Sequence, residues 1–136
     1  MVLNAGLTLS AGSSTVNFAA GTVSPSPGVV TVAGGVVLTG STTLSAALNG
    51  VNPGSYSQLA AGGAINLGGS TLSLVFGFEP PVGSSFEIVT NTGSAPITGM
   101  FNGLDEGAVF SQGGYQFQIT YQGGTGGSSV VLMRLA

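Results

Sequence analysis

Acid–base chemistry in this sequence would rest on four carboxylates, which are Glu79, Glu87, Asp105 and Glu106. The chain has no His and no Cys, so a Ser–His–Asp arrangement, a thiol nucleophile and the common zinc sites are excluded. A glycosidase would need two carboxylates that converge across a cleft. Asp105 and Glu106 are neighbours, which on a strand would point to opposite faces, and we expect both to be solvated in a loop. The sequence therefore predicts that the protein is not an enzyme.

Ligand-binding patterns are also weak. Asp105 and Glu106 are too few acids for a usual calcium site, and the Gly-rich segment 123–127 lacks the Lys of a phosphate-binding loop. We read this segment as a hairpin turn and expect no metal and no cofactor. An ice-binding array of Thr-x-Thr repeats is not expected either, because only Thr90-Asn91-Thr92 has that form.

An aromatic stripe runs through the C-terminal part of the chain, where Tyr115, Phe117, Ile119 and Tyr121 alternate with polar residues. Such a stripe could form a sugar-binding platform, but alternation is also typical of a strand with one buried face. We expect the stripe to belong to the core, and we keep a glycan-binding module as an alternative function.

The amino-acid composition limits the classes of partner that the protein is expected to bind. The chain has 136 residues, enough for one domain, with 43% hydrophobic and only 4% charged residues. One Arg and no Lys cannot neutralise several phosphates, so nucleic acid is not an expected partner. No apolar run approaches the length of about 18 residues that a membrane-spanning helix needs, and we expect no membrane insertion.

Apolar residues recur at every second position in many segments of the chain, and helical periodicity is absent. The clearest apolar stripe is Leu72, Leu74, Phe76 and Phe78, and Gly- or Pro-containing turns separate such runs. Residues 35–44 also resemble residues 63–72, 28 positions later, and residues 8–16 read as a looser third copy. Repeats of this length indicate stacked units. We expect a single all-β domain over residues 1–136, with β-solenoid-like stacked strand units over 1–78 and an antiparallel β cap over 79–136.

A group of short segments carries a family resemblance. They are YSQL (56–59), AINLGGSTL (64–72), VGSSFEIV (82–89), GMFNGL (99–104), EG (106–107), FQITY (117–121) and VVL (130–132). In this order and spacing they resemble the C-terminal β-helix end unit of bacterial autotransporter-type passenger proteins and related large surface proteins. The resemblance implies an extracellular or cell-surface location and a role in adhesion. The family has an Asn-Asp pair in the final turn where this chain has Ser128-Ser129, so no role of that Asp is carried over.

Our leading hypothesis is therefore a non-catalytic structural segment of an extracellular bacterial surface or adhesin-like protein. The first alternative is a self-assembling extracellular fibre subunit, joined by strand addition between copies. Expected partners are other copies of the chain or neighbouring rungs of a longer chain, with host or surface glycans as a further alternative. An uncharged N-terminal segment is the candidate assembly determinant, through Leu3, Leu7, Leu9, Val16 and Phe18.

Overall fold

The protein consists of β-strands in the computed structural model, which describes residues 2–3, 8–9, 16–18, 20–25, 28–52, 54–93, 97–123 and 128–135. These residues form fifteen strands and no helix. The all-β class predicted from the alternating pattern is therefore confirmed.

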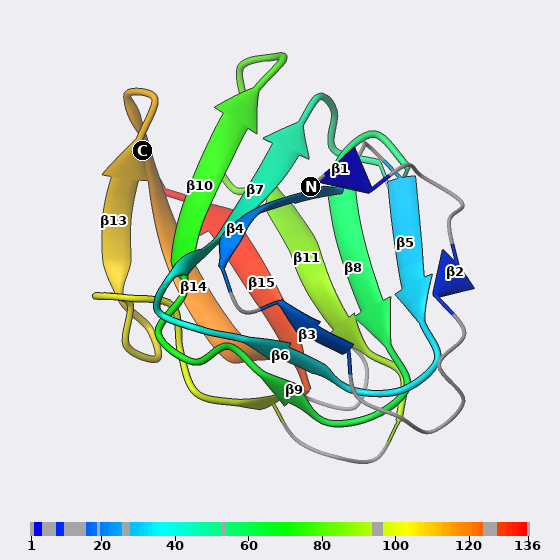
Figure 1. Cartoon of the computed structure of the whole chain (residues 1–136). Helices are drawn as coiled ribbons and strands as arrows, with labels where there is room; N and C mark the ends of the chain where they lie inside the picture. The colour runs from blue at the N-terminus through cyan, green and yellow to red at the C-terminus, as the bar shows by residue number, and fades with distance from the viewer. Residues whose placement is uncertain are drawn as a thin grey trace.

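The strands lie in three sheets (Figure 1). The first sheet has, in spatial order, β1 (Val2–Leu3), β4 (Gly21–Pro25), β7 (Thr42–Leu48) and β10 (Thr71–Phe76). The second sheet has β13 (Val109–Gln112), β14 (Tyr115–Gly123), β15 (Ser129–Arg134), β11 (Ser85–Asn91), β8 (Ser57–Ala61), β5 (Gly28–Val32) and β2 (Thr8–Leu9). The third sheet has β12 (Ile97–Thr98), β9 (Ile65–Asn66), β6 (Val36–Leu38) and β3 (Val16–Phe18).

Consecutive strands enter the three sheets in rotation. We call each set of three a pass: β1–β3, β4–β6, β7–β9 and β10–β12. Each pass adds one strand to every sheet beside the strand of the previous pass, and all pairs between passes are parallel. Parallel neighbours need a long connection, and here each connection consists of the strands that enter the other two sheets.

The register places like side chains beside one another. Leu44 pairs with Val23 on one side and with Leu72 on the other, and all three are buried. Thr43 pairs with Thr71, which is the predicted offset of 28 residues, while Val36 pairs with Ile65, 29 residues on. Residues 35–44 and 63–72 therefore lie one pass apart in the stack. The offset between paired residues is 29 in the third sheet and 28 in the first sheet.

The predicted third copy of this repeat, residues 8–16, is misplaced. In the structure Val16–Phe18 pairs with Val36–Leu38, and Val23 pairs with Leu44, so the equivalent residues are 16–23. Phe18 is 8% exposed and Val23 is 1% exposed, and this register buries both. The packing of these apolar side chains determines which residues pair. A comparison of Gly- and Ser-rich segments in the sequence did not reveal this pairing.

The antiparallel strands β13, β14 and β15 begin at Val109, whereas the sequence predicts an antiparallel region from residue 79. Between these points β11 and β12 continue the parallel order, because β11 pairs with β8 and β12 pairs with β9. On its other edge β11 pairs antiparallel with β15. Strand β11 thus joins the two kinds of pairing within the second sheet.

The core lies between the sheets and changes character toward the antiparallel strands. Valine, leucine, isoleucine and alanine make up most of it in the first three passes. Near β14 it becomes aromatic, with Phe117 stacked on Phe76 at 5.9 Å between ring centroids and on Phe110 at 6.1 Å. Phe86 and Tyr56 form a T-shaped pair with 5.3 Å between ring centroids. Aromatic rings thus connect β10, β11 and the antiparallel strands in this part of the core.

The predicted faces are largely confirmed. Leu72 and Leu74 are buried, whereas Phe76 at the end of β10 and Phe78 beyond it are half-buried. On β15 the inner face holds Val130 and Leu132, whereas Met133 on the outer face is 46% exposed.

The register of β10 can be tested with two neighbouring residues. Leu74 is 8% exposed and Val75 is 52% exposed. We expect Leu74→Asp to destabilise the fold by about 4 kcal/mol or more, because it buries an unpaired charge, and Val75→Asp to cost less than about 1 kcal/mol. Urea unfolding followed by circular dichroism measures both. Equal effects of the two substitutions would contradict the register.

Candidate functional site

The four carboxylates do not form a catalytic group. Glu79, Asp105 and Glu106 are exposed, and Glu87 is half-buried on β11, where it accepts a hydrogen bond from the Thr90 hydroxyl at 3.0 Å. Within the described residues, no three His, Cys, Asp or Glu side chains lie together as metal ligands would. Nothing in that part of the chain forms a helix with the length and apolar character needed to cross a bilayer.

Glu106 and Tyr121 together hold the loop that follows β12. The Glu106 carboxylate accepts the main-chain N–H of Tyr121 at 2.7 Å. The Tyr121 hydroxyl donates to the Leu104 carbonyl at 2.6 Å and accepts from the Phe101 N–H at 3.0 Å. These bonds tie the loop to β14. Although exposed as predicted, Glu106 therefore has a positioning role that the sequence did not reveal.

Burial of the Tyr121 ring raises the pKa of its hydroxyl to about 12. The hydrogen bond from the Phe101 N–H acts in the opposite direction, and the negative charges of Glu106 and Asp105 raise the pKa further. The neutral phenol is the form that can donate to Leu104, so the loop contact depends on the protonated side chain.

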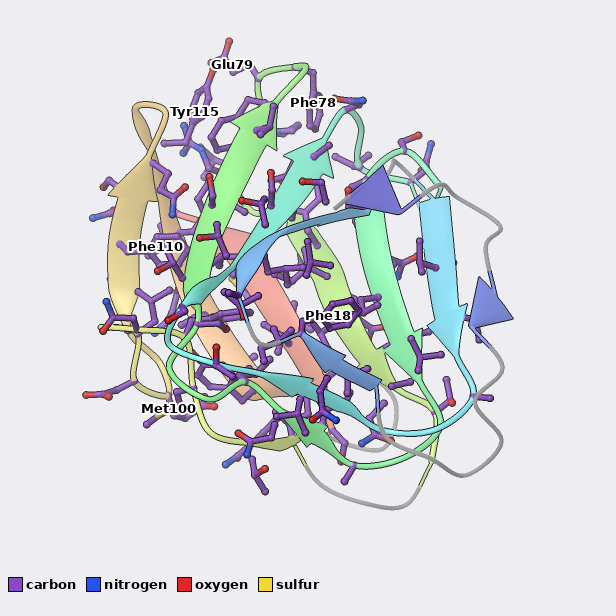
Figure 2. All side chains as sticks on the ribbon, viewed as in Figure 1. Phe18, Phe78, Glu79, Met100, Phe110 and Tyr115 are labelled. Carbon is purple, nitrogen blue, oxygen red and sulfur yellow. The ribbon has the colours of Figure 1, made fainter. Side chains whose placement is uncertain are left out.

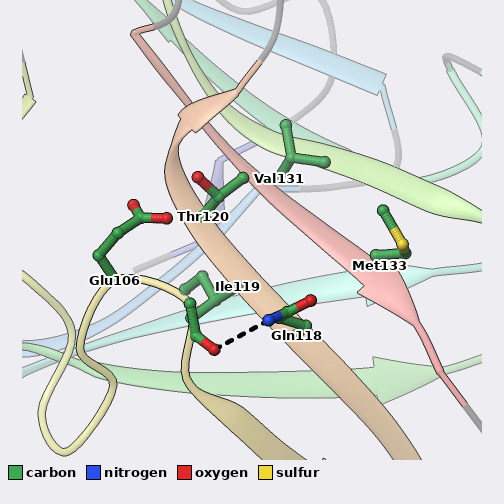
Figure 3. Close-up of a pocket in the computed structure, with 7 residues that line it drawn as sticks. Glu106, Gln118, Ile119, Thr120, Val131 and Met133 are labelled. Carbon is green, nitrogen blue, oxygen red and sulfur yellow. Dashed lines mark hydrogen bonds between the residues drawn. The ribbon is translucent and has the colours of Figure 1, made fainter.

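An open pocket of about 220 Å³ lies on the outer face of the second sheet, beside Glu106 (Figure 3). Its walls come from β14, β15 and the loop before β13, and include Ile119, Val131 and Met133. Gln118 is held at one side by a hydrogen bond to the Gly107 carbonyl at 3.1 Å. Glu106 is the one ionisable side chain among the lining residues, so the pocket lacks the pair of acids that glycoside hydrolysis requires.

The aromatic stripe on β14 faces the core, as expected from its alternation. Phe117, Ile119 and Tyr121 are buried, and Tyr115 is half-buried. The stripe therefore offers no exposed row of rings to a sugar. The alternating Gln118 and Gln122 lie on the solvent side.

The single basic side chain, Arg134, is also buried, at 7% exposed. Its guanidinium lies 4.9 Å from the centroid of the Tyr115 ring, in a cation–π contact. Within the described residues its Nε and Nη1 atoms have no hydrogen-bond partner. Arg134 is thus packed against the aromatic end of the core and is not exposed at the surface.

The candidate assembly residues fall on the first pass. Leu3, Leu9 and Val16 belong to β1, β2 and β3, and Phe18 at the end of β3 points into the interior (Figure 2). Leu7 lies outside the described residues. Among the described strands, β1, β2 and β3 each have a partner on one side and stand last in their sheets. The predicted segment therefore occupies one edge of all three sheets.

The opposite edge of the first sheet holds a contact that the sequence did not predict. Strand β10 stands last there, and the side chain of Gln112 at the end of β13 binds its main chain. Gln112 Nε2 donates to the Leu72 carbonyl at 2.9 Å, and Gln112 Oε1 accepts from the Leu74 N–H at 2.8 Å. Only the three-dimensional placement of β13 beside β10 could reveal this pair of bonds.

No family model, curated protein or solved structure matches this chain.

The tyrosine contact predicts a dependence of stability on alkaline pH. The pKa of Tyr121 is about 12 in the folded state, against an unperturbed 10.0. Below pH 10 both states keep the proton, and the contribution of the hydroxyl is fully present. Between pH 10 and pH 12 the unfolded state loses its proton first, so the free energy of unfolding should fall by up to about 1.4 kcal/mol per pH unit.

Tyr121→Phe should remove this part of the alkaline loss and cost about 1–3 kcal/mol at neutral pH, because Phe101 N–H and the Leu104 carbonyl lose their partner. Urea unfolding at several pH values tests both effects. A smaller alkaline loss should remain, since burial also raises the pKa of Tyr56. An unchanged alkaline profile in the variant would contradict the assignment.

Proposed function

We propose that the chain is a non-catalytic structural segment of an extracellular bacterial surface or adhesin-like protein. In this proposal its passes are the rungs of a short β-solenoid, and β13, β14 and β15 close one end of it. The observation that carries the proposal is the rotation of strands through three sheets with parallel register between passes. Such an arrangement can be lengthened by further passes without changing its cross-section, which suits a stalk.

The end of the stack supports the same proposal. Strand β15 pairs antiparallel with β11, and β14 and β13 follow by antiparallel pairing, so the second sheet turns away from the parallel order at this end. This agrees with an end unit, which is the part of bacterial passenger β-helices that the segments between residues 56 and 132 resemble.

The side-chain inventory supports a role without catalysis. Two of the acids make contacts within the fold: the exposed Glu106 positions a loop, and the half-buried Glu87 accepts a hydrogen bond from Thr90. With a formal net charge of −3 and a surface rich in Gly, Ser and Thr, the molecule has little means to attract a highly charged substrate.

Surface location can be tested on intact cells. We expect antibodies raised against the folded chain to label unpermeabilised cells of the organism that makes it, and protease added outside to remove the signal. A cytoplasmic protein probed in parallel controls for lysis. Labelling only after permeabilisation would contradict the extracellular assignment, whatever the fold.

A second candidate is a fibre subunit, and the position of the first pass favours it. Because β1, β2 and β3 stand last in their sheets among the described strands, strands of a second copy could pair with them. In this case particle mass would rise with protein concentration.

Lysine on these strands tests the fibre candidate, because a charged edge discourages strand addition. If copies join here, the double substitution Leu3→Lys and Leu9→Lys should keep the chain monomeric at concentrations where the parent associates, as measured by light scattering. The exposed pair Asn102→Lys and Gln122→Lys adds the same charge away from the edge and should have no effect. Equal effects of the two pairs would place any association elsewhere. A parent chain that stays monomeric would favour the stalk.

A further inference from the structure

Strand β10 has the features of an edge that invites another strand. It is six residues long, it carries no charged side chain, and it stands last in the first sheet. Its partner β7 lies on one side only. Proteins usually protect such edges with charges, prolines, bulges or a covering segment, because the free main-chain groups otherwise pair with another chain.

The groups that Gln112 binds are those that a further parallel strand would use. In a parallel pair, one residue of the neighbour donates its N–H to the carbonyl of residue i−1 and accepts the N–H of residue i+1. Opposite Ser73, those two groups are the Leu72 carbonyl and the Leu74 N–H. The Gln112 amide donates to the first at 2.9 Å and accepts from the second at 2.8 Å. One side-chain amide thus reproduces the hydrogen bonds of one residue of the missing strand.

The β13–β14 hairpin fixes Gln112 in this place. Gln112 pairs with Tyr115 across the hairpin, and the turn between them is Gly113-Gly114, with φ values of 62° and 86° that favour glycine. A Cβ atom at Gly113 would lie 2.5 Å from the ring of Phe76. The turn therefore lies in close contact with the Phe76 ring at the end of β10, which limits the freedom of the Gln112 side chain.

We infer that Gln112 caps the edge of β10 and thereby excludes a strand of a second copy of this chain. The strand excluded is β1, because β1 is the other end of the same sheet and runs parallel to β10 through β4 and β7. Placed beside β10, the β1 strand of a second copy would continue the sheet in its existing direction. With the cap in place, the first sheet accepts strands at its β1 edge alone. The inference rests on the order of this sheet and is independent of the proposed cellular location.

Amide exchange followed by nuclear magnetic resonance tests the cap in the unmodified protein. The Leu74 amide should exchange slowly although it lies at a sheet edge. In Gln112→Met, which keeps the side-chain length but cannot form either bond, the Leu74 amide should exchange about tenfold faster or more, while the Ser73 amide, which faces β7, should not change. Gln122→Met is the matched control, since Gln122 is exposed on the next strand. Fast exchange of Leu74 in the parent protein would overturn the inference without any variant.

Light scattering over a range of concentrations tests the exclusion of a second copy. Gln112→Met should associate at concentrations where the parent and Gln122→Met remain monomeric, and adding Leu3→Lys to Gln112→Met should reverse this association. A folded Gln112→Met protein with a fast Leu74 amide that stays monomeric would overturn the exclusion. Association that Leu3→Lys does not reverse would overturn β1 as the excluded strand. Neither result bears on cell-surface labelling, so failure of the cap and failure of the proposed function are separable.

Discussion

In a parallel sheet each residue lies beside its counterpart in the neighbouring strand. The register between neighbouring strands therefore determines which side chains of each strand face the core. A shift of one residue between β7 and β10 would turn Leu72 and Leu74 to solvent and bring Val75 inside. The offset between paired residues differs from sheet to sheet, with 28 residues between Thr43 and Thr71 and 29 between Val36 and Ile65, so the connections adjust while each sheet keeps its buried face. The register between passes is thus the constraint on which the core depends.

A stack held together in this way leaves open main-chain groups at both ends, and the two ends differ. At one end the described strands β1, β2 and β3 have free edges. At the other end the last pass has a different neighbour in each sheet. Strand β11 pairs with β15, and the main chain of β10 binds the Gln112 amide. The loop after β12 is hydrogen-bonded to Tyr121 of β14. The two ends of the described stack therefore differ in how their main-chain groups are covered.

Polar groups have a larger part in closing this end than the low charge of the chain suggests. Glu106, Tyr121 and Gln112 each satisfy main-chain groups that no strand pairs, and buried main-chain groups without partners are costly. Arg134, the only basic residue, is also placed inside, against Tyr115. These charged and polar side chains are therefore engaged in contacts within the fold.

The sequence by itself determined the all-β class, the buried face of β14 and the repeat between residues 35–44 and 63–72, because these depend on alternation and local turn chemistry within a strand or two. It did not determine where the repeat begins or where antiparallel pairing starts. The first depends on burying Phe18 and Val23 against strands some twenty residues away, and the second on β11 having β8 on one side and β15 on the other. Gln112 illustrates the reason most clearly: its partners Leu72 and Leu74 are about forty residues earlier in the chain, and only the packing of the β13–β14 hairpin against Phe76 brings them within hydrogen-bonding distance.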